Sequence, residues 1–221
     1  LKALRKKGKI DDRYIKVVGM GGDGATMDIG FQALSGAMER GHDMIYVCFD
    51  NEAYMNTGIQ RSSGTPMGAS TTTAPAGKVS MGQKTWKKNM PEIMVAHEIP
   101  YVATVCPSYP LDFIRKMEKA KSIKGPSYIH CFSVCPTGWR APSQTAVSMG
   151  RMAVETGVFP LFEVENGHYR VSPDMPKKLK PIRDYFKPQG RFRHLTNEEI
   201  DPIQERVTIE YKKLMEKAKF L

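Results

Sequence analysis

The sequence predicts an α/β protein, with an open, mostly parallel sheet that carries helices on both faces and is followed by a C-terminal extension. Short apolar runs alternate with longer segments of helical periodicity, a glycine-rich turn joins the first run to the first helix, and the pattern changes near residue 159. Strands that alternate with helices are typical of parallel sheets. The expected strands are 15–20, 44–49, 101–105 and 127–132, and the expected helices are 27–38, 91–97, 111–121 and 143–155.

The first part of this pattern is a strand–turn–helix–strand unit. Residues 15–20 form the first strand, and a turn follows at 21–24. Apolar residues recur at helical spacing over 27–38. The next strand, 44–49, is nearly all apolar, as expected for a strand that is covered on both faces. A crossover between two such parallel strands is right-handed.

Two segments depart from the alternation. Residues 57–90 are rich in Thr, Ser, Gly, Pro and Lys without periodicity, and a loop of that length inside a compact domain is usually functional or disordered. Residues 162–171 predict a hairpin whose Asn166-Gly167 pair favours a type I′ turn. A helix is expected from Asn197 to Lys219.

We therefore divide the chain into a ligand-binding domain over 1–158 and a C-terminal hairpin and helical extension over 159–221. The extension is expected to hold onto a partner subunit. The first domain is expected to be incomplete at its N-terminal end, because residues 1–7 resemble the end of a helix from a longer chain and include no initiator Met.

Composition narrows the class of protein. The hydrophobic content is 41%, the mean hydropathy is −0.41, and no apolar run approaches the roughly 20 residues that cross a membrane. The net charge of +10 favours an acidic partner. The basic residues are spread along the chain rather than clustered with aromatics, so a nucleic-acid partner is not expected. The four cysteines form no CxxC pair, which indicates a reducing, cytoplasmic compartment.

A glycine-rich turn at the end of the first strand is the first candidate site. The turn runs through Gly22, Asp23 and Gly24 into the start of a helix at Ala25 and Thr26. Free backbone N–H groups and the helix dipole at such a start suit a phosphate group, and glycines let the backbone come close to it. The carboxylate of Asp23 could hold a divalent metal against that phosphate.

A second polar segment follows the next strand, where Asp50 and Asn51 stand. Asn51 lies 28 positions after Asp23 (51 − 23), and one strand–helix–strand unit separates them. Because the carboxyl ends of parallel strands share one edge of a sheet, we expect both side chains to meet there. Mg²⁺ prefers carboxylate, amide and carbonyl oxygens together with diphosphate oxygens.

Taken together, these segments resemble the thiamine-diphosphate motif, in which an asparagine pair follows Gly-Asp-Gly, with Asp50 in place of the first asparagine. The likeness to β subunits of the 2-oxoacid:ferredoxin oxidoreductase family, those of pyruvate synthase in particular, covers nearly the whole chain. The motifs that carry it are Gly22–Gly30, Asp50–Ser63, Thr71–Thr73, Cys135–Arg140, Ala153–Gly157 and Gln189–Phe192.

The resemblance implies a set of cofactor ligands. Mg²⁺ would be bound by Asp23, by the side chain of Asn51 and by the backbone carbonyl of Ala53. The diphosphate would approach the Gly22 turn. Its oxygens would accept hydrogen bonds from the N–H groups of Gly24, Ala25 and Thr26.

The resemblance also implies roles for the residues that follow these ligands. Asn56 and Thr57 would lie near the thiazolium ring, where they would be the catalytic residues and Asn56 would bind the reacting 2-oxoacid. Two alternatives stay open for Tyr54, which either lines the pocket or packs against its surroundings.

The family also holds a [4Fe–4S] cluster through four cysteines, three of them in an N-terminal segment that is absent from this chain. The fourth matches Cys135, whereas Cys131, four residues earlier, is expected to be structural. Thiolate ligation is the usual way to hold such a cluster. The chain is thus expected to supply one ligand.

The implied reaction is oxidative decarboxylation of pyruvate to acetyl-CoA and CO₂, with electrons passed to ferredoxin. The expected partners are the other subunits of a hetero-oligomer, ferredoxin, pyruvate and coenzyme A. One alternative is a branched-chain (2-oxoisovalerate) ferredoxin oxidoreductase. Others are a non-oxidative thiamine-dependent decarboxylase or carboligase, and a basic binding module without catalysis.

Overall fold

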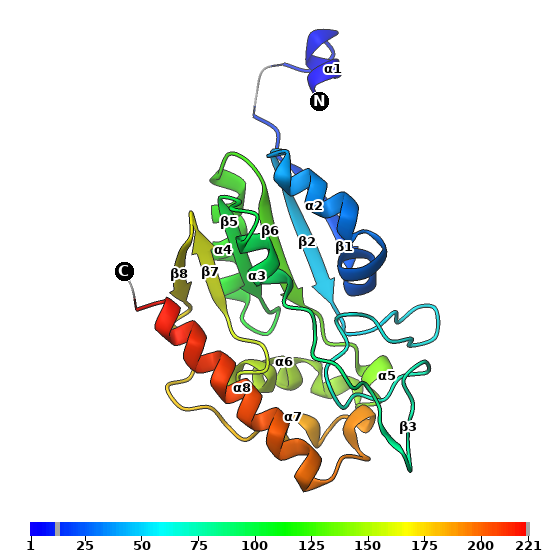
Figure 1. The fold of residues 1–221 in the computed structure, drawn as a ribbon. Coiled ribbons are helices and arrows are strands. Elements are labelled where there is room, and N and C mark those ends of the chain that lie inside the picture. Colours follow the sequence, from blue (N-terminus) through cyan, green and yellow to red (C-terminus); the bar gives the residue numbers. More distant parts are fainter. Residues whose placement is uncertain (12–13, 220–221) are drawn as a thin grey trace.

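The computed structural model describes residues 1–11 and 14–219 (Figure 1). Its main feature is a six-stranded sheet of order β1-β2-β6-β5-β7-β8, in which the first four strands are parallel and the last two are antiparallel. The strands are β1 Val17–Gly22, β2 Met44–Asp50, β5 Tyr101–Val105, β6 Ser127–Phe132, β7 Phe162–Glu165 and β8 His168–Val171. The predicted open, mostly parallel sheet is confirmed.

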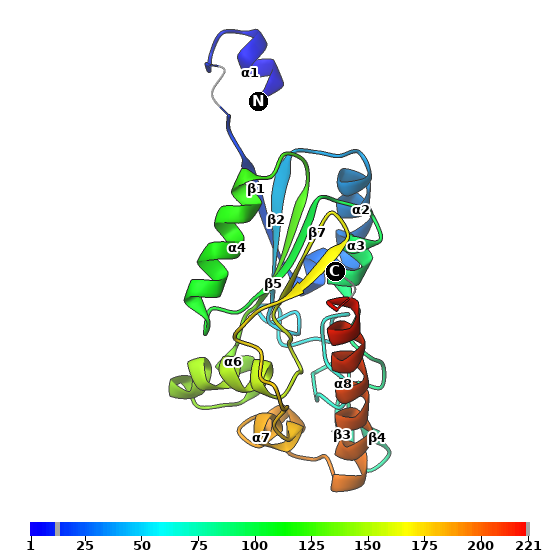
Figure 2. The same ribbon diagram turned by 90° about the vertical axis from the view of Figure 1, so that its left-hand side faces the viewer.

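Helices cover both faces of this sheet, as predicted (Figure 2). On one face, α4 packs Phe113, Met117 and Ala120 against β2, β5 and β6. On the other face lie α2, α3 and α8, and the carboxyl end of the sheet is closed by α5, α6 and α7. The helices are α1 Lys2–Lys6, α2 Phe31–Glu39, α3 Met90–Val95, α4 Pro110–Ser122, α5 Pro136–Trp139, α6 Ala146–Glu155, α7 Ile182–Phe186 and α8 Asn197–Lys217.

The first strand lies two residues further along the chain than predicted. Gly21 and Gly22 belong to β1 and pair with Cys48 and Phe49, so the expected turn at 21–24 is wrong at its first two positions. The strand can continue because glycine leaves room for its neighbour: a Cβ at Gly21 would overlap the hydroxyl of Tyr46.

The helix that follows starts tightly after the strand. A π-helical turn, Ala25–Ile29, leads into α2, and Thr26 donates from its hydroxyl to the Gly22 carbonyl at 2.7 Å. The predicted helix over 27–38 is therefore confirmed, with a π turn at its beginning. Single π turns inside helices are frequent at functional sites.

The expected loop at 57–90 is largely irregular. It contains one short hairpin, β3 Ala76–Gly77 with β4 Ser80–Met81, and α3 begins at its last residue. Ser62, Thr65 and Ala69 are buried, so the loop packs inward. Its inward face lies against the ends of β1 and β2, because a Cβ at Gly64 would come within 3.0 Å of both Asp23 and Asp50.

The C-terminal part of the chain joins the main body. The predicted hairpin is confirmed, with φ of 48° at Asn166 and 83° at Gly167, but β7 pairs with β5, so the sheet runs across the proposed boundary at residue 158. In α8, Ile200, Ile203 and Leu214 are buried in the chain's own cores. The division into two domains and the partner contact of the extension stay predictions.

Within the described ranges, no helix combines the length and the apolar character that crossing a membrane requires. The longest of them, α8, starts with a capping box. The Thr196 hydroxyl accepts from the Glu199 N–H, and the Glu199 carboxylate accepts from the Thr196 N–H at 2.9 Å.

This cap leads to a stability prediction. Thr196→Ala removes the hydroxyl that satisfies a backbone donor at the helix start, so the free energy of unfolding should fall by about 1 kcal/mol. Thr208→Ala, in the middle of the same helix, is the control and should change it by less, because alanine is favoured in a helix interior. Chemical denaturation measures both, and equal losses would contradict the assigned cap.

Candidate functional site

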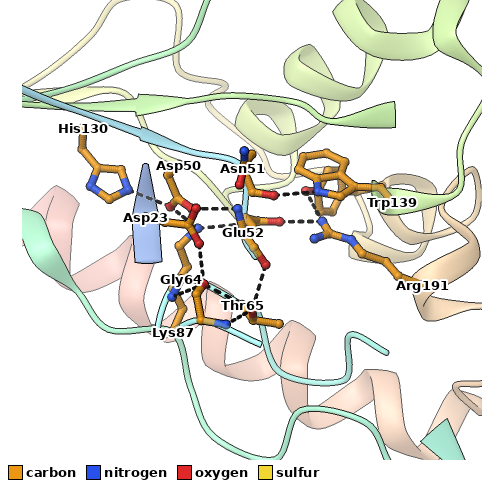
Figure 3. Close-up of polar contacts among 12 residues, drawn as sticks. Asp23, Asp50, Asn51, Glu52, Gly64, Thr65, Lys87, His130, Trp139 and Arg191 are labelled. Carbon is orange, nitrogen blue, oxygen red and sulfur yellow. Dashed lines mark hydrogen bonds and ion pairs between the residues drawn. The ribbon is translucent and has the colours of Figure 1, made fainter. Parts of the chain in front are cut away.

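Asp23 and the segment from Asp50 to Ala53 meet at the carboxyl edge of the sheet. Strands β1 and β2 are parallel neighbours, with Gly22 paired to Phe49, so both chains leave the sheet at the same level. Figure 3 shows Asp23, Asp50 and Asn51 close together at this edge. The predicted meeting of Asp23 and Asn51 is confirmed.

The Asn51 amide lies between two oxygen atoms. One of its terminal atoms is 2.9 Å from Asp23 Oδ1 and 2.8 Å from the carbonyl oxygen of Ala53. With its nitrogen there, the amide donates to both. With its oxygen there, three oxygens face one another, which only a cation makes favourable. Adjacent ligands of an octahedral Mg²⁺ ion at 2.0–2.1 Å lie about 2.9 Å apart, so this spacing fits magnesium.

Asp23 is buried, with 1% of the residue's surface exposed. Burial, followed by the charge of Asp50, raises the pKa of Asp23 from its ordinary 3.8 to about 7. The Ser62 hydroxyl donates to Asp23 Oδ2, which leaves Oδ1 directed at Asn51. A cation at this point would favour the ionised carboxylate by charge attraction.

Asp50 does not face the same point. Its buried carboxylate pairs with Lys87, and His130 Nε2 lies 2.8 Å from Oδ2. Burial acts to raise the pKa of Asp50, but the Lys87 charge and the His130 hydrogen bond outweigh it and hold that pKa at about 2. In turn, although burial acts to lower it, the charges of Asp50 and Glu52 raise the pKa of Lys87 above its ordinary value.

The Gly24 turn is packed against Tyr54. The Tyr54 hydroxyl donates to the Gly24 carbonyl and to Asp28 Oδ2, each at 3.1 Å, and a Cβ at Gly24 would overlap the tyrosine ring. Tyr54 thus packs against the turn, and its place in the lining of the cofactor pocket stays a prediction. The diphosphate contacts of Gly22, Gly24, Ala25 and Thr26 stay predictions.

Asn56 and Thr57 lie in an exposed turn that follows Asn51 and Ala53 in the chain. A bridge between Tyr54 and Gln60 closes this turn, and the Thr57 hydroxyl donates to Gln60 Oε1 at 2.5 Å. The turn belongs to the same carboxyl edge as Asn51. The roles of Asn56 and Thr57 toward the thiazolium ring and the 2-oxoacid stay predictions.

Cys135 differs from the other three cysteines. Cys48, Cys106 and Cys131 are buried, whereas Cys135 is half-buried at the start of α5. Burial raises the pKa of Cys48 and of Cys131 to about 12, which disfavours the thiolate that metals require. No group of three or more His, Cys, Asp or Glu side chains with metal-binding geometry occurs in the ranges 1–11 and 14–219. The cluster role of Cys135 stays a prediction.

Sequence reasoning missed the groups that surround Asp23, Asn51 and Ala53. Four of them come from distant parts of the chain, and none of the six is marked by a periodic signal. Four of them stand in motifs that were noticed without these residues being given a role: Glu52 and Ser62 in Asp50–Ser63, Trp139 in Cys135–Arg140 and Arg191 in Gln189–Phe192. The full set is Glu52, Ser62, Lys87, His130, Trp139 and Arg191.

The class of protein follows from this geometry together with a family match. A family model described as the C-terminal thiamine pyrophosphate-binding domain of thiamine pyrophosphate enzymes matches residues 7–131. This range contains Asp23, Asn51 and Ala53, which converge at the sheet edge. The fold and the site therefore define a thiamine-pyrophosphate-binding domain.

Similar proteins narrow the class further. Pyruvate synthase subunit PorB of Methanocaldococcus jannaschii is 59% identical over 92% of this chain and 68% of its own length. Ketoisovalerate oxidoreductase subunit VorB of Pyrococcus horikoshii is 53% identical over 99% of this chain and 70% of its own length. The chain belongs to the family of these thiamine-pyrophosphate-binding oxidoreductase subunits.

A solved structure shows the same fold. It is the 2-oxoglutarate:ferredoxin oxidoreductase from Magnetococcus marinus with 2-oxoglutarate, coenzyme A and succinyl-CoA bound. It matches with a TM-score of 0.52 and 23% identity over 67% of this chain and 56% of that one. The chain thus spans little more than half of that structure, and the likeness concerns the fold alone.

Proposed function

We propose that this chain is the thiamine-diphosphate-binding subunit of a 2-oxoacid:ferredoxin oxidoreductase that converts pyruvate and coenzyme A to acetyl-CoA and CO₂. The observation that carries the proposal is the convergence of Asp23, the Asn51 amide and the Ala53 carbonyl at the ends of β1 and β2. The relatives named as pyruvate synthase subunits support it.

These three residues would hold Mg²⁺. Asp23 Oδ1 supplies the charged ligand, Ala53 supplies its backbone carbonyl, and the Asn51 amide turns its oxygen toward the ion. Octahedral coordination would be completed by diphosphate and water oxygens. The N–H groups of Gly24, Ala25 and Thr26 would bind the same diphosphate, aided by the positive end of the helix dipole.

The chain's other residues would orient the reactants. When bound, thiamine diphosphate supplies the nucleophilic carbon and the electron sink for decarboxylation. Asn56 would donate from its amide to the 2-oxoacid, and Thr57 would lie beside it. The buried carboxyl edge beneath them keeps water away from Asp23, which is 1% exposed. Desolvation of this kind strengthens every charge interaction within the site.

Electron transfer would need groups beyond this chain. Cys135 would supply one ligand of a [4Fe–4S] cluster, with the remaining ligands provided elsewhere in a hetero-oligomer. Ferredoxin would accept the electrons, and the net charge of +10 suits a carrier of opposite charge. We place the complex in the cytoplasm, because its thiols are free and the iron–sulfur chemistry requires a reducing compartment.

A branched-chain substrate is the second candidate, because relatives named ketoisovalerate oxidoreductase subunits match 99% of this chain at 53% identity. The test is substrate-dependent reduction of ferredoxin by the assembled complex, with pyruvate and 2-oxoisovalerate compared at equal concentration. We expect a higher kcat/KM for pyruvate and full dependence on thiamine diphosphate, Mg²⁺ and coenzyme A. A preference for 2-oxoisovalerate would favour the second candidate, and no dependence on thiamine diphosphate would overturn both.

A further inference from the structure

We propose that Glu52 is a positioning residue of the magnesium site, and that Arg191 makes the C-terminal part of the chain a component of that site. This inference rests on the proposed function. Glu52 stands between Asn51 and Ala53, whose side-chain amide and backbone carbonyl converge with Asp23. Its own carboxylate points away from that convergence, toward Arg191 (Figure 3).

The backbone of Glu52 explains how two neighbouring groups reach one point. Its φ is 70°, in the left-handed region that residues with a side chain rarely adopt. Such a conformation is strained and persists only where the surroundings hold it. Here it reverses the chain so that the Asn51 side chain and the Ala53 carbonyl face the same side. A relaxed conformation at Glu52 would separate these two groups.

Every polar group of Glu52 has a partner that holds this conformation. Its N–H donates to Asp50 Oδ1 at 3.0 Å, and its carbonyl accepts from the Thr65 hydroxyl at 2.8 Å. Its two carboxylate oxygens accept separately, one from Lys87 at 2.9 Å and the other from Arg191 at 2.5 Å. Since the side chain is only 1% exposed, water does not compete with these partners.

Arg191 is itself fixed in place. It is 3% exposed, its Nε donates to Gln189 Oε1 at 2.8 Å, and its guanidinium lies 4.0 Å above the Trp139 ring. The Trp139 Nε1 in turn donates to the Asn51 carbonyl at 2.9 Å. Arg191 and Trp139 therefore hold two consecutive residues of the metal-binding segment. Arg191 lies outside the range 7–131 that the thiamine pyrophosphate family model matches.

A purely structural role for the ion pair is the competing explanation. Buried ion pairs often add little net stability, because taking two charges out of water costs as much as their attraction returns. A strained backbone adds to this cost. Partners that orient metal ligands, by contrast, typically change metal affinity by about 10–100-fold when they are removed. The two explanations therefore differ in what a variant does to the magnesium requirement.

The experiment compares Arg191→Met with Lys116→Met in the assembled complex. Lys116 is a matched control, since it is 1% exposed and pairs with buried Asp112 at 2.7 Å away from Glu52. Thiamine diphosphate binding is titrated against Mg²⁺, and the unfolding temperature is measured without cofactor. Both variants should lower the unfolding temperature. Only Arg191→Met should raise the half-saturating Mg²⁺ concentration, by at least about tenfold.

Two further variants guard against a failure of Arg191→Met to assemble. Arg191→Lys keeps the charge but loses the planar fork, and Glu52→Gln keeps the shape but loses the charge, so both should raise the Mg²⁺ requirement. An unchanged requirement in the variants that assemble, with a lowered unfolding temperature, would overturn the inference. If the wild-type complex itself bound no thiamine diphosphate in the presence of Mg²⁺, the proposed function would fail instead.

Discussion

Asp23→Ala should reduce the affinity of the complex for thiamine diphosphate by at least about 100-fold. Loss of a group that only orients a metal ligand typically lowers metal affinity by about 10–100-fold, and Asp23 is proposed to be a ligand itself. The substitution removes the charged group of the proposed magnesium site, and only the neutral oxygens of Asn51 and Ala53 would remain to hold the ion against the diphosphate. Equilibrium binding at fixed Mg²⁺ measures the loss. Asp43→Ala is the control. Asp43 precedes the first residue of β2, at the opposite end of that strand, where it pairs with Lys16 at 2.5 Å.

A second measurement separates lost binding from lost folding. Because the folded-state pKa of Asp23 is raised to about 7, the cofactor-free protein holds this proton more tightly than the unfolded chain does. The contribution of the protonated Asp23 to the free energy of unfolding is fully present below pH 3.8 and is lost as the pH rises through about 7. Without Mg²⁺, Asp23→Asn should therefore be at least as stable as the wild type at pH 8. Normal cofactor retention by either variant would refute the assignment of Asp23.

The second large effect concerns iron. Cys135→Ala should remove one [4Fe–4S] cluster from the complex and abolish ferredoxin reduction, because a cluster that loses a thiolate ligand is destabilised. Cys131→Ala is the matched control, since Cys131 lies on β6 only four residues away but is 6% exposed with a pKa near 12. It should keep the full iron content and lose only packing.

Iron and acid-labile sulfide analysis of the purified complexes shows whether the Cys135 variant has lost a cluster. Equal iron in the wild type and in the Cys135 variant would mean that another group holds the cluster. Loss of iron in both variants would point to a general collapse near α5, which begins directly after Cys135. The unfolding temperature of the complex distinguishes that collapse from loss of a single ligand.

The sequence alone determined the sheet and the place of the site. Apolar runs marked β5 and β6 to the residue, because buried parallel strands are continuous in hydrophobicity. The order strand, glycine turn, helix and strand placed Asp23 and Asn51 at one edge, since parallel strands end on the same side. The prediction placed the start of the turn two residues too early, because Gly21 and Gly22 are typical loop residues. Only the packing of Tyr46 shows why a strand needs glycine there.

Only the tertiary structure decided what holds the segment from Asp50 to Ala53 in place. Arg191 reaches Glu52 across 139 positions of sequence, and His130 reaches Asp50 across 80. Contacts of this kind leave no periodic trace, because each depends on where two unrelated segments come together in space. The left-handed backbone at Glu52 is equally invisible in the sequence, since glutamate has no local preference for it. Its partners Asp50, Thr65, Lys87 and Arg191 come from four places in the chain, and they meet Glu52 where water is excluded.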